Sequence, residues 1–235
     1  MRARVLCNSE PLGAAMSSLQ PLSSGSLSDE VFEKLVTAIT LGEFELGQKL
    51  SEAELARSLG ISRGPLREAL GRLEGRLVTR TPRIGVRVIE LNREKVQSLY
   101  IAREALEGMA CRIAAEKMTD KQLAGLRAIL ETDSQRPEVS AGQSYTPTSY
   151  DEDFHWAIVQ AAQSETIERV LMTEVYYQLR LLRRKSSARP GRAKAALTEH
   201  FRILGALEAH NPDEAETEMR AHLRNARYSS LAAIA

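Results

Sequence analysis

The chain has only two cysteines, Cys7 and Cys111, among its 235 residues. Two thiols cannot form a disulfide framework or a four-thiolate zinc site, which predicts a protein of the reducing cytosol. No stretch approaches 18 consecutive apolar residues, so a membrane-spanning helix is excluded. Aromatic residues make up 5% of the chain, beside 14 glycines and 8 prolines. This composition disfavours a β-sandwich or barrel and favours helices.

The chain also has almost no net charge. Its 32 lysines and arginines are balanced by 31 aspartates and glutamates, which leaves a formal net charge of +1. Taken alone, that balance disfavours a protein that coats nucleic acid. The average hides a local asymmetry: residues 55–89 carry eight arginines against two glutamates, a local balance of +6. Every basic residue there is arginine, which makes bidentate contacts with phosphate and guanine. This stretch therefore indicates a surface for nucleic acid.

Helical periodicity begins near residue 28. Residues 1–27 lack it, so we expect a flexible N-terminal arm, or in part an upstream extension if translation starts at Met16. Apolar side chains then recur at helical spacing as far as Ile39, and Ser28 is the expected N-cap of this first helix.

Two shorter helices follow at close spacing. Ser51 and Glu54 form a capping box at the start of the first, and Gly60 ends it. Ser62 is the expected N-cap of the second, with Pro65 in its first turn, where a missing amide costs little.

After Gly75 the apolar period changes from helical to alternating. Two short strands are expected at 77–80 and 86–89, around a tip at 82–85. A helix, a tightly joined helix pair and a hairpin together form the pattern of a winged helix-turn-helix, which we predict for residues 28–90.

Arginines occupy the positions where such a fold meets DNA. Arg63 and Arg67 are four residues apart, so both project outward from the third helix and can enter a major groove. Backbone amides at the Ser62 end suit a phosphate, and Gly85 would let the hairpin tip approach a minor groove, with Arg83 supplying charge. A lone arginine pair is commonly a solvated helix face. Its coincidence with the helix pair, the hairpin and the one-sided charge favours DNA binding.

From Asn92 onward the pattern is helical throughout. Asn92 caps a long helix, and Thr119 or Asp120 starts the next. Further helices are expected at 147–162, 165–186, 193–209 and 212–232. We therefore predict a linker at 91–95 and an antiparallel bundle of six or seven helices over 96–235, the size of an independent domain. The predicted fold class is mainly α.

All four histidines lie in this helical half. Asp151 and His155 are four residues apart and share one helix face, while His200 and His222 lie on two antiparallel neighbours that can bring them to the same depth. One carboxylate and three imidazoles can bind a divalent metal and leave positions open for water or a ligand. Ordinary core or solvated residues are the alternative. His210 abuts a turn and is not an expected ligand.

Three sequence runs in the N-terminal half are distinctive enough to compare with known families: GQKLSE at 47–52, GISRGPLREAL at 60–70 and PRIG at 82–85. Residues 31–88 with these runs resemble the DNA-binding domain of GntR-type bacterial transcription regulators. The resemblance implies that Arg63 and Arg67 contact bases, that Gly85 marks the wing tip, and that the same surface is lined by Ser62, Gly64 and Pro65. The chain departs from the family in two places: Ala53 stands where many members have arginine, and Gly75-Arg76 is one residue shorter than the usual junction.

The helical half carries Asp151-x-x-Phe154-His155, then Glu199-His200, then a histidine near the end of the last helix. This signature resembles the FCD effector-binding domain of the FadR subgroup of GntR regulators. The resemblance implies that the metal ligands are Asp151, His155, His200 and His222. It also implies that the metal is zinc, or in some members nickel or another divalent ion, and that it helps to hold a small carboxylate effector.

Arg103 aligns with an arginine that often faces the effector in the family, and a guanidinium is a suitable partner for a carboxylate. The alternative is an exposed salt bridge with Glu107, four residues further along the helix.

The sequence thus predicts a ligand-responsive transcription regulator, a repressor that binds a palindromic operator as a homodimer, because one recognition helix covers only a half-site. A small carboxylate bound beside the metal would release it from DNA.

An enzyme is the alternative. An Asp/His₃ site could activate water, as in a metal-dependent hydrolase with an accessory DNA-binding domain. Glu152 and His155 form one Glu-x-x-His, whereas di-iron bundles need two such motifs and two further glutamates. The chain has no His-Glu-x-x-His, no Gly-x-Ser-x-Gly and no phosphate-binding glycine loop. We therefore expect a regulator and no enzymatic activity.

Overall fold

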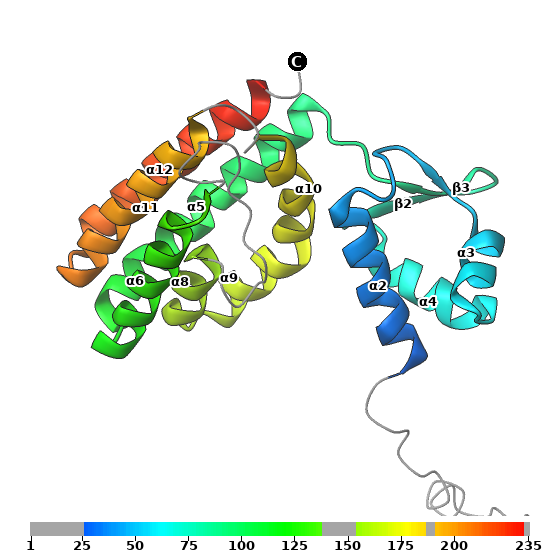
Figure 1. Ribbon diagram of the computed structural model, residues 1–235, viewed down its shortest axis with the longest axis horizontal. Coiled ribbons are helices and arrows are strands. Elements are labelled where there is room, and N and C mark those ends of the chain that lie inside the picture. The colour runs from blue at the N-terminus through cyan, green and yellow to red at the C-terminus, as the bar shows by residue number, and fades with distance from the viewer. Residues whose placement is uncertain (1–25, 138–153, 187–190, 233–235) are drawn as a thin grey trace, which may run out of the picture.

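The computed structural model describes residues 26–137, 154–186 and 191–232. The chain forms an N-terminal unit of helices and a small sheet, and a C-terminal layer of helices that lie along the long helix α5 (Arg93–Lys117) (Figure 1). The mainly α fold class is confirmed. The arm predicted for residues 1–27 lies almost entirely outside the described residues.

The N-terminal unit contains α2 (Leu27–Leu41), β1 (Lys49–Leu50), α3 (Glu52–Leu59), α4 (Arg63–Leu73), β2 (Val78–Thr81) and β3 (Gly85–Val88). The sheet is antiparallel in the order β1-β3-β2. The helices and the β2–β3 hairpin follow the predicted winged helix-turn-helix. The strand β1 was not predicted, because two residues are too few to reveal an alternating pattern.

The apolar stripes read from the sequence form the core of this unit. Helix α2 packs on α4, and the buried side chains of the two helices are Val31, Phe32, Leu35, Val36, Ile39, Leu66, Ala69, Leu70 and Leu73. The strands close this core with Val78, Val86 and Val88. The outward face of α4 is thereby fixed.

The first helix begins earlier than predicted, because its N-cap is Ser26 and not Ser28. The Ser26 hydroxyl accepts a hydrogen bond from the Asp29 amide at 3.3 Å, and the Asp29 carboxylate accepts one from the Ser26 amide at 3.0 Å. This reciprocal pair is a capping box, which only a residue three positions before Asp29 can form. Ser28 is buried instead, and its hydroxyl donates to Glu68 of α4 at 2.9 Å.

The short junction between α4 and the wing is a tight turn. Gly75 adopts a left-handed conformation with φ 78°, which glycine reaches without steric cost. Its amide donates to the Val78 carbonyl at 2.9 Å, and the Arg76 amide donates to the Leu73 carbonyl at 3.0 Å. The wing therefore forms directly after this short junction.

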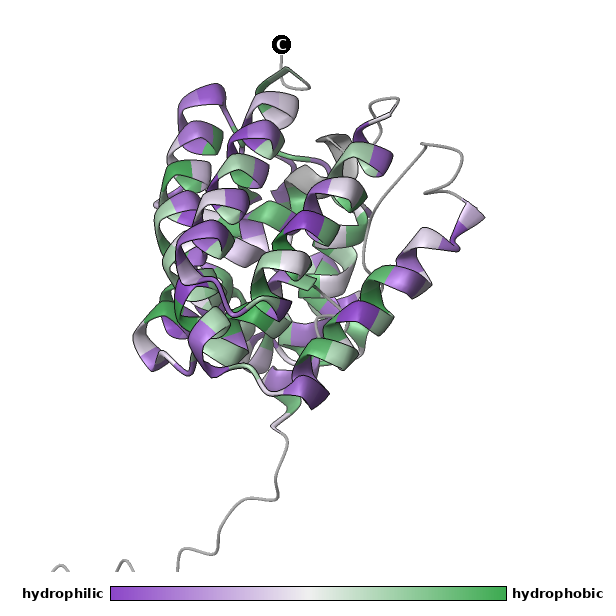
Figure 2. Cartoon of the chain, turned by 90° about the vertical axis from the view of Figure 1, so that its left-hand side faces the viewer, coloured by the Kyte–Doolittle hydropathy of each residue, from purple (hydrophilic) through white to green (hydrophobic). Residues whose placement is uncertain are grey.

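The C-terminal half contains, besides α5, the helices α6 (Asp120–Ser134), α8 (Phe154–Ala162), α9 (Glu165–Val170), α10 (Tyr177–Ser186), α11 (Arg192–Glu208) and α12 (Pro212–Ala232). Helix α5 begins inside the predicted linker of 91–95 and packs against α8, α11 and α12. Both hydrophobic and hydrophilic residues occur around these helices (Figure 2). In the described part of the chain, no helix is long and apolar enough to cross a membrane.

The segment predicted as a single helix over 165–186 is helical throughout, but it consists of three successive parts and its middle part is not an α-helix. A π-helical segment, η1 (Leu171–Tyr176), joins α9 to α10. Single turns of π-helix occur frequently at functional sites. Here the segment leads directly to the contact between the two halves of the chain.

Helix α10 connects the helical half to the winged half. The ring of Tyr177 meets Phe32 of α2 edge to face, with centroids 6.2 Å apart. The Gln178 amide nitrogen donates to the Gly75 carbonyl at 3.1 Å. Apolar side chains continue from one half into the other as one buried cluster. The turn between α4 and the wing is thus anchored to the helical half.

Candidate functional site

The predicted DNA-reading face lies on the outer side of α4. Its inner side is buried, so Arg63 and Arg67 at the start of the helix are exposed together, as are Ser62 and Gly64, whereas Pro65 is half-buried. Ser62 has N-cap backbone geometry but its hydroxyl makes no capping hydrogen bond. The start of the helix therefore presents polar groups to solvent.

Glu52 of α3 holds two of the arginines near this face. Its carboxylate accepts from Arg67 Nε at 2.7 Å and from Arg80 Nη1 at 3.1 Å. The bond to Arg67 and the bond to Arg80 both lower the pKa of Glu52, against the opposing effect of partial burial. Glu52 thus holds the guanidinium of Arg67 through its Nε, and the Arg67 side chain remains 60% exposed.

The hairpin tip carries the other predicted contacts. Arg83 and Gly85 are both exposed and have positive φ angles of 67° and 103°. Within the described residues Arg63 and Arg83 have no ion pair, whereas Arg67 has one with Glu52. The recognition helix and the wing thus offer two solvated arginines and one that is held in place.

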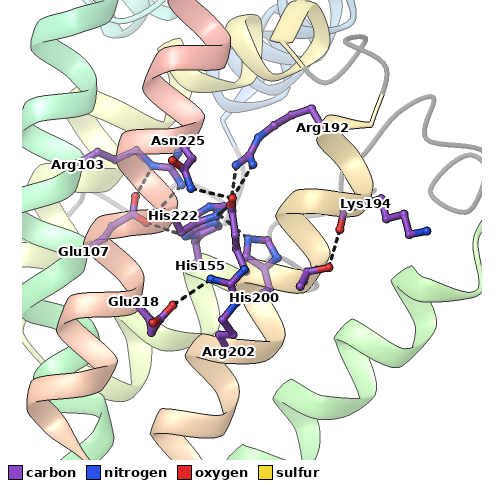
Figure 3. Close-up of polar contacts among 12 residues, drawn as sticks. Arg103, Glu107, His155, Arg192, Lys194, His200, Arg202, Glu218, His222 and Asn225 are labelled. Atoms are coloured by element: carbon purple, nitrogen blue, oxygen red, sulfur yellow. Dashed lines mark hydrogen bonds and ion pairs between the residues drawn. The ribbon is translucent and has the colours of Figure 1, made fainter.

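Three histidines from three helices meet inside the bundle (Figure 3): His155 of α8, His200 of α11 and His222 of α12. Each is at most 5% exposed, and one ligand nitrogen of each lies within 4.8 Å of the other two. The Nε2 atoms of His200 and His222 are 3.3 Å apart. The structure brings these three predicted ligands together. The fourth, Asp151, lies outside the described residues.

Two carboxylates flank the cluster. Glu107 of α5 places Oε2 2.7 Å from Nδ1 of His155, and Glu199 of α11 places Oε2 2.7 Å from Nδ1 of His222. His200 is held differently, because the Phe154 ring stacks on it with centroids 4.4 Å apart. Glu199 is thus hydrogen-bonded to His222 at Nδ1, on the side of the ring away from Nε2, and Glu107 lies within ion-pair distance of Nδ1 of His155.

The charge states suit a cation. Burial opposes ionisation of Glu107 more than any other single cause, but Arg103 and His155 together outweigh it and lower the pKa to about 2. Burial also opposes ionisation of Glu199, whose hydrogen bond with His222 contributes to a pKa of about 2. Burial lowers the pKa of His222 to about 3, although Glu199 acts in the opposite direction. At neutral pH the carboxylates are ionised and His222 is neutral, as a metal ligand must be.

The donor set fits a divalent transition metal. Imidazole nitrogens suit zinc, copper, iron and nickel. In a tetrahedral zinc site with Zn–N distances of about 2.0–2.1 Å, two ligand nitrogens are about 3.3 Å apart. The Nε2 atoms of His200 and His222 have that separation. His210 is not part of the cluster, because its Nδ1 lies 2.8 Å from the Ala115 carbonyl oxygen.

Arg103, the predicted effector contact, is 2% exposed and lies beside Glu107. Its Nε donates to Glu107 Oε1 at 2.5 Å and its Nη2 donates to Oε2 at 3.3 Å. The alternative prediction for Arg103 was an exposed salt bridge with Glu107. Glu107 is its partner, but the predicted exposure is wrong, because the ion pair is buried. Both side chains project from the inner face of α5 toward His155.

A small pocket opens against the other carboxylate. It has a volume of about 370 Å³ and is lined by Gly191, Arg192, Ala195, Glu199, Asn225, Tyr228 and Ser229. Arg192 and Asn225 both donate hydrogen bonds to Glu199. The pocket therefore lies against Glu199, whose carboxylate also contacts His222.

Glu52, Glu107 and Glu199 were not predicted as site residues. Glu52 and its partner are 15 residues apart, and Glu199 and His222 are 23 apart. Only local signals pointed to them: Glu107 follows Arg103 by four residues, and Glu199 directly precedes His200. The contacts themselves depend on how the helices pack.

A winged helix-turn-helix joined to a helical bundle with an internal histidine cluster is the architecture of a bacterial transcription regulator. Residues 27–88 match the family described as "Bacterial regulatory proteins, gntR family", and residues 98–225, more than half of the chain, match the "FCD domain". The chain belongs to the GntR family of bacterial regulatory proteins and carries an FCD domain.

Two individual relatives are transcription regulators as well. The chain is 39% identical over 127 residues to the Nta operon transcriptional regulator of Aminobacter aminovorans, a match that covers 53% of this chain and 58% of that protein. It is 29% identical over 208 residues to the probable D-xylose utilization operon transcriptional repressor of Paenarthrobacter nicotinovorans. This match covers 86% of this chain and 88% of that protein.

A solved structure also resembles it over nearly the whole length. A putative GntR transcriptional regulator from Rhodococcus sp. RHA1 has a TM-score of 0.69 and 27% identity, covering 88% of this chain and 99% of that one. These comparisons indicate regulation of transcription.

The Glu52 ion pairs give a pH prediction. We expect Glu52→Gln to lower the free energy of unfolding at pH 7 by less than about 1 kcal/mol, because exposed ion pairs are weak. The pKa of Glu52 in the folded protein lies below its ordinary value of 4.5. Its contribution is therefore complete above that value and is lost as the pH falls through the folded-state pKa. Urea denaturation of both proteins at a series of pH values measures the difference. A difference that grows toward acid pH would contradict this assignment.

Proposed function

We propose that this protein is a ligand-responsive repressor, which binds a two-fold operator as a homodimer and is released by a small carboxylate bound beside a divalent metal. One observation carries the proposal: a DNA-reading face and a buried histidine cluster occur in one chain, and α10 connects their two halves. One recognition helix reads only a half-site, so two copies are needed for a palindrome. The relative named as a probable repressor of a D-xylose utilization operon supports repression.

On the DNA side, Arg63 and Arg67 would contact base edges in the major groove. Ser62, Gly64 and Pro65 would face the phosphate backbone at the start of the same helix, where amide groups favour an anion. At the wing, Arg83 and Gly85 would lie at the minor groove of the neighbouring part of the half-site. The excess of arginine in residues 55–89 supports these assignments.

On the ligand side, His155, His200 and His222 would hold the metal, with Asp151 as the fourth protein ligand. Zinc is the metal that we propose, with nickel as the alternative. Such an ion acts as a Lewis acid that binds a carboxylate oxygen. Arg103 would supply the second contact to the effector, and a carboxylate that reaches it must share it with Glu107.

The release of DNA follows from a shift between two populations of the dimer. An effector favours the state that it binds more tightly. In the bound state we expect α10 to move relative to α2, because Tyr177 and Gln178 contact the winged half at Phe32 and Gly75. A displaced Gly75 turn would carry the recognition helix and the wing out of register with successive grooves.

Arg67 tests the DNA-reading face. Arg67→Ala should weaken binding to an operator selected from a random duplex library by about 1–3 kcal/mol, because it removes a base contact. Arg202→Ala removes an equal charge from α11, where the side chain is 60% exposed, and serves as the control. Fluorescence anisotropy at constant salt measures both. Equal affinities of Arg67→Ala and wild type would exclude Arg67 from recognition.

His200 tests the metal site. Zinc should raise the unfolding temperature of the wild type, because a ligand that binds the native state stabilises it by about 2.7 kcal/mol at 100 times its Kd. His200→Ala should lose most of this shift. His210→Ala should keep it, because His210 contacts the Ala115 carbonyl outside the cluster. If both variants respond to zinc as the wild type does, the three histidines are not the site.

A further inference from the structure

Two separate series of polar contacts end at the histidine cluster. In the first, Arg103 contacts Glu107, and Glu107 contacts His155. In the second, Arg192 contacts Glu199, and Glu199 contacts His222. Figure 3 shows Arg103 and Arg192 approaching the cluster from different helices. Each series has the order arginine, carboxylate, imidazole.

The carboxylates dictate which imidazole nitrogen faces inward. An ionised carboxylate can only accept hydrogen bonds, so the Nδ1 atom that it contacts must carry the proton. Nε2 is then the lone-pair nitrogen of that neutral ring. At His222 this agrees with the position of Nε2, which lies 3.3 Å from Nε2 of His200.

The outer partners immobilise the carboxylates. Arg103 binds both oxygens of Glu107. Arg192 makes a two-pronged contact with Glu199 at 2.9 and 2.8 Å, and Asn225 donates to the same carboxylate at 2.9 Å. Both carboxylates are nearly inaccessible to solvent, with side-chain exposures of 1% for Glu107 and 10% for Glu199. The fixed Glu199 carboxylate holds the ring of His222 through a hydrogen bond, and the fixed Glu107 carboxylate holds His155 through a close ion-pair contact.

We propose that Glu107 and Glu199 are positioning residues of the metal centre. Each would hold one histidine in the tautomer and ring orientation that presents Nε2 to a divalent cation. Outer carboxylates of this kind raise the basicity of a ligating imidazole, and their loss typically weakens metal binding by about 10–100-fold. The inference rests on the proposed metal site and adds two residues to it.

The test compares Glu107→Gln and Glu199→Gln with Glu218→Gln in the full-length protein. Glu218 lies on α12 near the cluster but pairs with Arg202 at 3.8 Å, so its replacement removes an equal charge without touching a histidine (Figure 3). Zinc affinity is measured by competition with a chromophoric chelator. The absorption spectrum of the cobalt-loaded protein reports the ligand geometry, which a purely structural role would leave unchanged.

We expect zinc affinity to fall by about 10–100-fold in Glu107→Gln and Glu199→Gln and to stay unchanged in Glu218→Gln. The cobalt spectrum should change only in the first two. Thermal unfolding of the metal-free proteins identifies a variant that has not folded. If Glu107→Gln does not fold, Glu199→Gln decides the question, because its carboxylate is less deeply buried.

Wild-type zinc affinity and an unchanged cobalt spectrum in the folded variants would overturn the positioning role while leaving the metal site intact. If the wild type binds neither zinc nor cobalt, the proposed metal function fails, and this inference fails with it.

Discussion

Buried charge is the constraint on which the rest of the helical half depends. Glu107 and Glu199 are ionised inside a bundle, where a carboxylate is tolerated only when it is paired and hydrogen-bonded. The partners of Glu107 lie on α5 and α8, and those of Glu199 lie on α11 and α12. Helix α5 must therefore keep its position on α8, and α11 must keep its position on α12. The same packing brings three imidazoles from three helices together.

The histidine cluster is also connected to the winged half by a series of side-chain contacts. Trp156 follows His155 on α8, and its ring meets Tyr176 at the end of η1 with centroids 6.2 Å apart. The next two residues, Tyr177 and Gln178, contact α2 and the turn after α4. A change in the position of α8 thus has a packed route to the junction between the recognition helix and the wing. A continuous series of packed side chains of this kind supports energetic coupling between the histidine cluster and the DNA-reading face. Measurements of the coupling free energy test it.

Local signals predicted most of the fold, and long-range packing determined the rest. Asn92 and Thr119 cap the helices expected from them, and the hairpin forms around its predicted tip. Ser26 replaced Ser28 as a cap because the reciprocal bond of Asp29 decides between two neighbouring serines. Helical spacing also predicted which histidines converge. The carboxylate partners could not be predicted, because contacts such as that of Glu107 with His155 depend on how α5 and α8 pack.

If a metal-held ligand controls the affinity for DNA, the effect of that ligand on DNA binding depends on the metal. The most direct measurement titrates a panel of small organic acids into complexes of a fluorescent operator duplex with zinc-loaded and with metal-free protein. We expect at least one carboxylate to release the zinc-loaded protein and to leave the metal-free protein bound. Equal release of both forms would contradict it.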